Sequence, residues 1–280
     1  MAKGPNPPSY EGSDNPLAFA VNERDKDVID MVRASILRRD VMLAYQPVME
    51  ARRPRKVAFY EGLIRILDET GRVIPARDFI EVVETQELGR KIDVLALDAG
   101  CLMLHEKPDL RLAVNLSARS IGYPDWTATL RRWIARDTTL GERLILEITE
   151  SSAMTVPDLV TAFMADLHRE GIAFALDDFG AGFTSFRYLR DFYFDILKID
   201  GQFIRNVSTD ADNQVLAQAL VQIGQQLDMF TVAESVETEA DAAFMRSLGV
   251  DCMQGYLFGA PTTAPAWGDR GMRWNRKKAG

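Results

Sequence analysis

The sequence predicts an α/β fold, a modified TIM (β/α)8 barrel in which the first strand runs antiparallel to the second. Short apolar runs typical of strands occur eight times, and helical patterns separate most of them, which indicates a parallel sheet closed into a barrel. One connection breaks this alternation, because only residues 49–56, with Pro54 among them, lie between the first two strands. A parallel crossover needs about a dozen residues or more, so we expect the first strand to be reversed.

The elements are expected in a regular order along the chain. Strands are expected at short apolar runs bounded by turn residues, namely Val41–Val48, Val57–Ile64, Leu110–Leu116, Leu144–Thr149, Ile172–Leu176, Phe194–Ile199, Phe230–Ala233 and Asp251–Gln254. Helices are expected where apolar residues recur every three or four positions, namely residues 24–39, Ala76–Glu84, Ile92–His105, Trp126–Arg136, Pro157–Arg169, Ser185–Asp191, Ala211–Leu227 and Glu239–Leu248.

The two ends of the chain differ in composition from the part between them. Residues 1–22 are rich in Pro, Gly, Ser and Asn, so we expect a disordered N-terminal arm. Residues 23–267 would form the barrel domain, and residues 268–280 form a basic tail with three Arg and two Lys against one Asp. A solvated tail is the simpler interpretation, and an anionic partner is the alternative. No further sensor domain is expected within the leading residues, so regulation would come through dimerisation, the arm, the tail or another protein.

Charge and composition exclude several classes of protein. The net charge of −8 and the pI near 5.0 argue against binding to a nucleic-acid polymer. We expect a cytoplasmic protein with no membrane span, because no signal-peptide pattern and no apolar run of about 18 residues is present. Cys101, Cys252, His105 and His168 are too few and too scattered for a zinc site, so any metal site must be built from oxygen ligands.

The stretch Ile172–Ser185 joins an apolar strand to two adjacent carboxylates and a glycine-rich turn. Asp177 and Asp178 repel each other and lose hydration at the mouth of a buried strand, which is costly unless a divalent cation neutralises them. Gly180 and Gly182 would let the backbone turn close to the ion. The alternative is an Asp helix cap beside an ordinary surface acid.

Polar side chains end seven consecutive strands of the expected barrel. They are Glu61, Asn115, Glu147 with Glu150, Asp177 with Asp178, Lys198 with Asp200, Glu234 with Glu237, and Gln254. Each alone could be a helix cap or a rim salt bridge, but together they would converge on the C-terminal face of the barrel. So many acids would need cations, and all-oxygen ligation indicates Mg²⁺ or Mn²⁺, with two ions as in phosphodiester cleavage. Lys198 and Arg65 would supply positive charge for a phosphate or an activated water.

Over residues 40–261 the chain resembles the EAL-domain family of cyclic di-GMP phosphodiesterases. The resemblance depends on ordered motifs: Y-Q-P at Tyr45–Pro47, E-G-L-I-R at Glu61–Arg65, N-L-S at Asn115–Ser117, E-I-T-E at Glu147–Glu150, D-D-F-G-A-G at Asp177–Gly182, K-I-D at Lys198–Asp200, A-E-S-V-E at Ala233–Glu237 and Q-G-Y at Gln254–Tyr256. It implies a barrel with a reversed first strand, a homodimer, and hydrolysis of cyclic di-GMP to linear 5′-pGpG with Mg²⁺ or Mn²⁺.

The resemblance also implies a role for each motif residue. The first ion would be held by Glu61, Asn115, Glu147 and Asp177, and Asp177 would bridge to a second ion held by Asp178 and Glu234. The catalytic residues would be Lys198, which orients or activates the attacking water, Glu234 and Asp178. The dinucleotide would be contacted by Gln46, Arg65 and Gln254. Glu150 and Glu237 would anchor the Phe179–Ser185 loop, which couples the active site to the dimer interface in this family.

The chain departs from the family pattern at a few positions. Gly62 stands where the family has Ala, and Ser235 replaces the usual Gly, which could tighten the backbone near the second ion. Phe183 and Thr184 stand where Tyr and Ser are more common. No metal-ligand position is lost, which favours an active enzyme. The alternatives are a non-catalytic cyclic di-GMP receptor or protein-interaction module on the same fold, and a barrel whose rim acids are structural.

Overall fold

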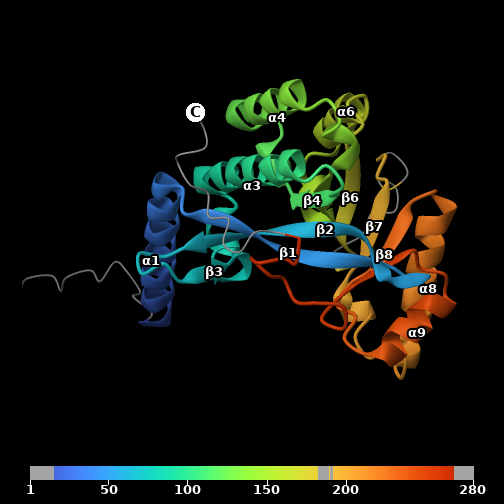
Figure 1. Cartoon of the computed structure of the whole chain (residues 1–280). Coiled ribbons are helices and arrows are strands. Elements are labelled where there is room, and N and C mark those ends of the chain that lie inside the picture. Colours follow the sequence, from blue (N-terminus) through green and yellow to red (C-terminus); the bar gives the residue numbers. More distant parts are fainter. Residues whose placement is uncertain (1–15, 182–188, 190–191, 268–280) are drawn as a thin grey trace, which may run out of the picture.

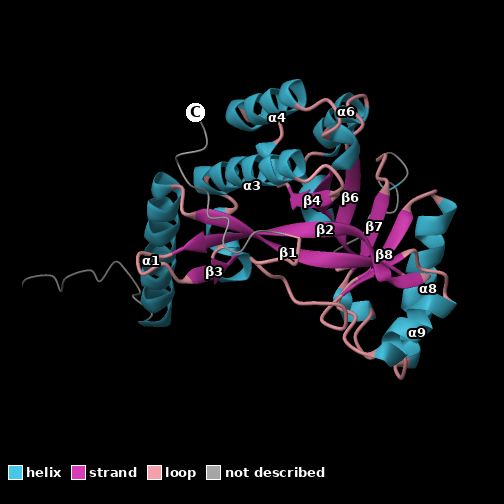
Figure 2. Ribbon diagram, viewed as in Figure 1, coloured by secondary structure: helices cyan, strands magenta, loops and turns pink. Residues whose placement is uncertain are grey.

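The computed structural model describes residues 16–181, 189 and 192–267, and within them eight strands close into a barrel with helices around it (Figures 1 and 2). The barrel strands are β1 (Val41–Glu50), β2 (Arg53–Leu67), β4 (Leu112–Asn115), β5 (Leu144–Thr149), β6 (Ala173–Phe179), β7 (Ile196–Ile199), β8 (Phe230–Ala233) and β9 (Cys252–Gln254). They are ordered β1-β9-β8-β7-β6-β5-β4-β2, and the pairing of β1 with β2 closes the ring.

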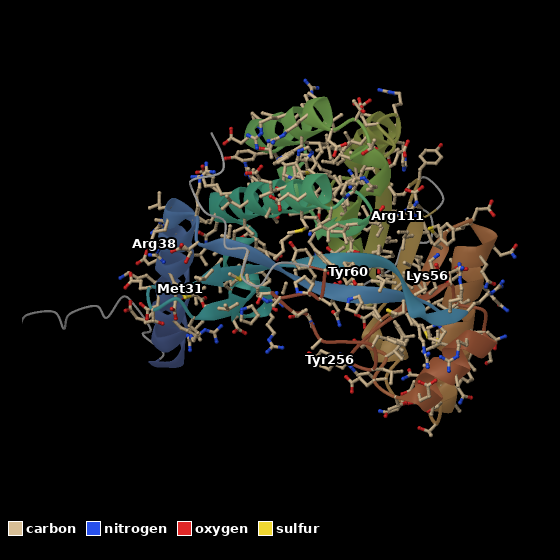
Figure 3. The ribbon with its side chains drawn as sticks, in the orientation of Figure 1. Met31, Arg38, Lys56, Tyr60, Arg111 and Tyr256 are labelled. Atoms are coloured by element: carbon tan, nitrogen blue, oxygen red, sulfur yellow. The ribbon has the colours of Figure 1, made fainter. Side chains whose placement is uncertain are left out.

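The reversed first strand is confirmed. Strand β1 pairs antiparallel with both of its neighbours, β2 and β9, whereas the remaining neighbours in the described barrel pair in parallel. The turn is tighter than expected, because β1 ends at Glu50 and β2 begins at Arg53. In Figure 3 this hairpin extends from the helix that carries Met31 and Arg38 to the neighbourhood of Lys56.

Strand β2 continues past the barrel rim, where it pairs antiparallel with a short strand that the sequence analysis missed. This strand is β3 (Val73–Pro75), and it places Pro75 opposite Arg65. Three residues that end in proline give too short a pattern to distinguish a strand from a turn. The end of β2 and β3 thus form a small hairpin, residues 65–75, beside the carboxyl ends of the parallel strands.

The helices agree with the expected pattern at most positions. Their bounds are α2 (Ile80–Val83), α3 (Glu87–Glu106), α4 (Pro124–Arg136), α5 (Glu150–Thr155), α6 (Pro157–His168), α8 (Ala211–Gln226) and α9 (Glu239–Ser247), with 3-10 turns η1 (Ala76–Asp78), η2 (Ala118–Ser120), η3 (Gly141–Arg143) and η4 (Gly201–Phe203). The single helix expected over Ala76–Glu84 is instead η1 followed by α2, because the backbone at Phe79 is not helical. The short α5 was missed, and most of the helix expected at Ser185–Asp191 lies outside the described residues.

Helix α1 (Pro16–Arg38) begins earlier than the helix expected at residues 24–39, so residues 16–22 of the expected arm are helical. Pro16 suits the first turn of a helix, and the apolar stretch Leu17–Val21 continues it. The helix is fixed by Val32, which is fully buried, and by Ser35, whose Oγ donates to the carbonyl oxygen of Leu67 at 2.7 Å. Residues 1–15 and the basic tail at 268–280 lie outside the described residues. In the described part of the chain, no helix has the length and apolarity required to cross a membrane.

Apolar side chains form two separate cores. A large core lies between the barrel and the surrounding helices and includes Leu97, Trp126 and Phe174. A smaller core takes one buried residue from each barrel strand and therefore lies inside the barrel; it consists of Val48, Phe59, Ala113, Ile145, Ala175, Ile196, Val232 and Cys252. We call this set the apolar layer. It closes the barrel below the site described next.

Candidate active site

Directly above the apolar layer, each barrel strand contributes one polar side chain. These residues, which we call the polar layer, are Gln46, Glu61, Asn115, Glu147, Asp177, Lys198, Glu234 and Gln254. On the parallel strands each lies two residues after its partner in the apolar layer, as Glu147 follows Ile145. On the reversed β1 the order is inverted, and Gln46 precedes Val48. Because side chains two apart on a strand share a face, both layers point into the barrel.

Lys198 lies at the centre of the polar layer, with 1% of its side chain exposed. Its Nζ is 2.8 Å from Asp177 Oδ1, 2.8 Å from Glu234 Oε1, 3.1 Å from Glu147 Oε2 and 3.5 Å from Glu61 Oε2. One ammonium group thus faces four carboxylates among the described residues. A buried group of this kind is costly unless further positive charge is supplied.

The pKa values in this cluster reflect burial and mutual repulsion. Burial raises the pKa of Glu147 and of Glu234 well above the usual value, and neighbouring carboxylates add to the effect although Lys198 opposes it. Burial alone would lower the pKa of Lys198, but the negative charges of Asp177, Glu147 and Glu234 raise it well above its ordinary value. Burial also acts to raise the pKa of Glu61, yet Lys198 and the hydrogen bond from Gln254 leave it lowered.

Asp178 reaches the same mouth through an irregularity in strand β6. Adjacent strand residues normally point to opposite faces, so Asp177 and Asp178 should diverge. At Asp178 the backbone is left-handed, with φ of 55°, and the pairing of β6 with β7 shifts between Leu176 and Phe179. This bulge places Asp178 beside Asp177. The side chain of Asp178 is exposed at the mouth, and partial loss of hydration together with the Asp177 charge raises the pKa of Asp178 to about 6.

The described carboxylates form two groups with the spacing of a metal site. Glu61, Glu147 and Asp177 bring ligand oxygens within 4.8 Å of one another, and so do Asp177, Asp178 and Glu234. Asp177 belongs to both groups, as expected for a residue that bridges two ions. The residues fit a hard cation, because the donors are oxygens and Glu147 Oε1 is buried without a hydrogen-bond partner in the described chain. Asn115 donates to Glu61 Oε1 at 3.1 Å, which leaves its own side-chain oxygen for a ligand.

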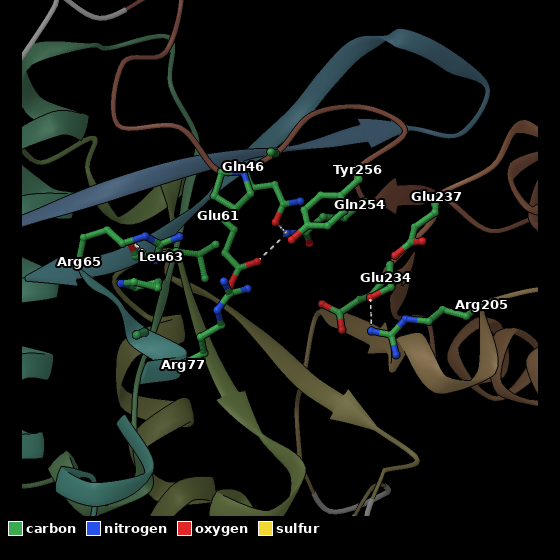
Figure 4. A pocket seen from close by; sticks show the side chains of 16 residues that line it. Gln46, Glu61, Leu63, Arg65, Arg77, Arg205, Glu234, Glu237, Gln254 and Tyr256 are labelled. Carbon is green, nitrogen blue, oxygen red and sulfur yellow. Dashed lines mark hydrogen bonds between the residues drawn. The ribbon is translucent and has the colours of Figure 1, made fainter. Parts of the chain in front are cut away.

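Gln46 and Gln254 contact each other and Glu61. Gln254 Nε2 donates to Glu61 Oε2 at 2.6 Å and to Gln46 Oε1 at 3.0 Å, and Gln46 Nε2 donates to the carbonyl oxygen of Gly259 at 3.1 Å. The dashed line at Glu61 in Figure 4 marks one of these bonds. The chain of hydrogen bonds fixes the orientation of the Glu61 carboxylate.

A pocket of about 530 Å³ opens beside the polar layer (Figure 4). Its lining contains Gln46, Glu61, Glu234 and Gln254 from the polar layer, and Arg65 from strand β2. Three further lining residues, Arg77, Arg205 and Tyr256, were not predicted from the sequence. Tyr256 ends the Q-G-Y motif, which could have identified it, but nothing local distinguishes Arg77 or Arg205 from other surface arginines.

Of the remaining predicted residues, Glu237 lines the pocket, whereas Glu150 and Asp200 accept hydrogen bonds from backbone N–H groups and are not among the lining residues. Glu150 is buried at the start of α5 and accepts a hydrogen bond from the backbone N–H of Gly180 at 3.0 Å, so it contacts the loop after β6. Glu237 is exposed and lines the pocket, and residues 182–185 of the loop it was expected to anchor lie outside the described residues. Asp200 caps η4 by accepting from the backbone N–H of Gln202 at 2.7 Å, so it serves the turn.

Two described departures from the family pattern are accommodated by local packing. Ser235 has a left-handed backbone with φ of 53°, a conformation that explains the usual glycine. Its side chain occupies the space where a Cβ on Gly201 would lie, so the two positions complement each other. A Cβ on Gly62 would lie 3.1 Å from Leu43 Cδ1 and 3.3 Å from the carbonyl oxygen of Ala113, so glycine suits a tight place between strands. The positions of Phe183 and Thr184 lie outside the described residues.

Comparisons with known proteins agree with this geometry. The EAL domain profile matches residues 29–261. The chain is 32% identical over 238 residues to the bifunctional diguanylate cyclase/cyclic di-GMP phosphodiesterase MucR of Pseudomonas aeruginosa, covering 83% of this chain and 35% of that protein. It is 34% identical over 208 residues to the cyclic di-GMP phosphodiesterase PdeF of Escherichia coli, covering 72% and 28%.

A solved structure shares the fold. The PaMucR phosphodiesterase in complex with c-di-GMP superposes with a TM-score of 0.74 at 31% identity, covering 86% of this chain and 98% of that one. The chain spans about a third of the length of the two curated relatives, 35% and 28%.

Proposed function

The chain belongs to the EAL domain family, and we propose that it is a metal-dependent phosphodiesterase that hydrolyses cyclic di-GMP to linear 5′-pGpG. The proposal depends on one observation above all: Asp177 is shared by two groups of carboxylates at the mouth of the barrel. Two adjacent ions can stabilise both the attacking and the leaving oxygen of a phosphodiester. The relatives named above as phosphodiesterases support the same substrate class.

The proposed ligands follow from these groups. Glu61, Asn115, Glu147 and Asp177 would hold a first ion, and Asp177, Asp178 and Glu234 would hold a second. Hard oxygen donors favour Mg²⁺ or Mn²⁺. When bound, these cations would supply Lewis acidity at the phosphodiester.

Lys198 would position the reacting groups. Its Nζ touches both proposed ligand groups, 2.8 Å from Asp177 and 2.8 Å from Glu234, so it can donate a hydrogen bond to a water between them. From this position Lys198 would orient or activate the attacking water. Glu234 and Asp178, the other residues proposed as catalytic, would act by holding the second ion.

The substrate would lie in the pocket beside the polar layer. Arg65, Gln46 and Gln254 line it and would contact the dinucleotide. Gln46 and Gln254 would also keep Glu61 in place through the hydrogen bonds described above. A homodimer, a cytoplasmic location, and coupling of the loop after β6 through Glu150 and Glu237 remain predictions.

A turnover assay tests the proposal. Purified protein with cyclic di-GMP and Mg²⁺ or Mn²⁺ should produce pGpG, and excess EDTA should stop the reaction. Intact substrate with both cations would contradict the proposal. Calorimetry on the same samples separates the alternatives. A receptor would bind cyclic di-GMP without turnover, whereas a barrel with structural acids would bind neither cyclic di-GMP nor the divalent cation.

A further inference from the structure

We propose that Arg77 acts with Arg65 as a binding pair for the second phosphate of the cyclic dinucleotide, the one that is not being cleaved. The inference deepens the proposed function and rests on it. It assigns a substrate-binding role to a residue outside every motif noted in the sequence.

Arg77 and Arg65 enter the pocket from the same wall. Arg65 pairs across the β2–β3 ladder with Pro75, and Arg77 follows two residues later on η1. Both residues line the pocket, and Figure 4 shows them on the same side of it. Arg205 lines the opposite side, beside Glu234 and Glu237.

The turn that holds Arg77 is fixed although its side chain is free to meet a ligand. Ile74 before the turn and Phe79 after it are buried, with 6% and 1% exposed. The backbone N–H of Phe79 donates to the carbonyl oxygen of Ala76 at 3.0 Å and closes the turn. The side chain of Arg77 is 79% exposed. The backbone is therefore anchored and the guanidinium group remains available.

Among the described residues, neither guanidinium group forms a short ion pair with a carboxylate. Arg65 Nη1 donates to neutral carbonyl oxygens, at 2.9 Å on Ile64 and 3.3 Å on Leu63. Arg77 makes a long ion pair with its exposed neighbour Asp78, with Nε 3.6 Å from Oδ1. Burial and the positive charge of Arg77 lower the pKa of Arg65 from its usual value, although the negative charges of Glu61 and Asp78 oppose this effect. A bound anion would add to that opposing negative charge.

The chemistry of the substrate supplies that anion. A cyclic dinucleotide carries two phosphodiester groups on opposite sides of its ring, and only one can occupy the cluster of carboxylates and ions. The other remains negatively charged and needs a cationic partner away from the acids. Arginine suits this role, because its planar guanidinium group can donate two parallel hydrogen bonds to phosphate.

The test compares one substrate that has a second phosphate with one that lacks it. Wild type, Arg77→Ala and Arg77→Lys are assayed on cyclic di-GMP and on bis(p-nitrophenyl) phosphate, a diester with a single phosphate. For Arg77→Ala we expect KM for cyclic di-GMP to rise about tenfold with kcat nearly unchanged, because the variant loses one charge-assisted hydrogen bond to the substrate. The single-phosphate diester should be hydrolysed as by wild type, and Arg77→Lys should lie between.

The matched control is Arg72→Ala. Arg72 lies in the turn of the same β2–β3 hairpin, and its side chain is 74% exposed. It pairs with Asp68 at 3.2 Å and does not line the pocket. An equal rise in KM for Arg72→Ala would indicate general attraction by net charge and would overturn the proposal. So would an unchanged KM for Arg77→Ala, or a rise that appears only in Arg205→Ala.

A second measurement separates this inference from the proposed function. If wild type fails to hydrolyse cyclic di-GMP, only the proposed activity fails, and calorimetry with cyclic di-GMP and Ca²⁺ then decides the role of Arg77. Weaker binding by Arg77→Ala than by wild type and Arg72→Ala would support the inference. Equal binding by all three proteins, or no binding by wild type, would overturn it.

Discussion

The apolar layer and the polar layer of the barrel interior have the same backbone geometry and opposite energetics. Each takes one side chain from every described barrel strand, and the two layers are two residues apart along each strand. The apolar layer is stabilised by removal of its side chains from water. The polar layer buries carboxylates around Lys198, which costs free energy in the absence of further positive charge. The same strands therefore carry the residues that stabilise the barrel and the residues of the candidate site, two positions apart.

This difference shows how a barrel accommodates an unfavourable site. The acids lie where strands are already held by the apolar layer below and by the helices outside. Ser235 and Asp178, both with left-handed backbones, also lie at this level, so local strain and unpaired charge occur in the same part of the molecule. Substitutions in the two layers should consequently have effects of different kinds.

The largest effect is expected for Asp177→Asn. It removes the residue common to both carboxylate groups, so turnover should fall by roughly a thousandfold or more while nucleotide binding survives in part. Asp178→Asn is the comparison, because Asp178 belongs to one group alone and should cost less. Steady-state assays of both variants with saturating Mg²⁺ measure the difference. Near-normal activity of Asp177→Asn would contradict the two-ion arrangement.

Lys198→Ala should lower turnover by about a hundredfold and affinity by much less, because the ammonium group would act on the attacking water. The variant also leaves four carboxylates without their central cation, so its melting temperature should fall in EDTA. Adding Mg²⁺ should restore more of the melting temperature than it does for wild type. Equal losses in kcat and affinity would indicate a binding role for Lys198 instead.

In the apolar layer, Ile196→Ala should act on stability alone. Ile196 is 7% exposed and lies two residues before Lys198, so the truncation leaves a cavity directly below the site. We expect the free energy of unfolding to fall by about 2–4 kcal/mol, measured by urea denaturation. Turnover per folded molecule should stay within about threefold of wild type. A loss comparable to that of Lys198→Ala would show that the two layers are not independent.

The smallest effect is expected for Asp93, an acid buried outside the barrel, which can be compared with the acids of the polar layer. Asp93 on α3 is 9% exposed and accepts hydrogen bonds from Ser120 Oγ and the backbone N–H of Ser117, yet burial raises its pKa to about 7. Because the folded state holds this proton more tightly than the unfolded state, stability falls as pH rises through 7. Between pH 6 and pH 8 wild type should lose about 1.4 kcal/mol relative to Asp93→Asn.

The control for this measurement is Asp109→Asn, which changes an exposed acid in a turn. Urea denaturation at both pH values should show no difference between that variant and wild type. If the free energy of unfolding of Asp93→Asn changes between pH 6 and pH 8 as much as that of wild type, Asp93 does not hold its proton near neutral pH. That result would contradict the prediction.

Much of the fold could be predicted because its signals are local. The bounds of β5 and β8 match the expected runs, and the short link between the first two strands required the reversal of β1. The placement of polar residues at the ends of successive strands also indicated which side chains would meet at one face of the barrel. Strand β3 and helix α5 were missed because three and six residues carry too little pattern.

By itself, the sequence determined the order of the strands, the direction of the first one and the residue types at the carboxyl ends, because pleat period, loop length and chemistry belong to neighbouring residues. Only the tertiary structure decided which oxygens share a centre. The bulge that brings Asp178 beside Asp177 and the position of Lys198 among four carboxylates depend on the stagger and packing of distant segments. No local pattern encodes those distances, since they follow from closing the whole barrel.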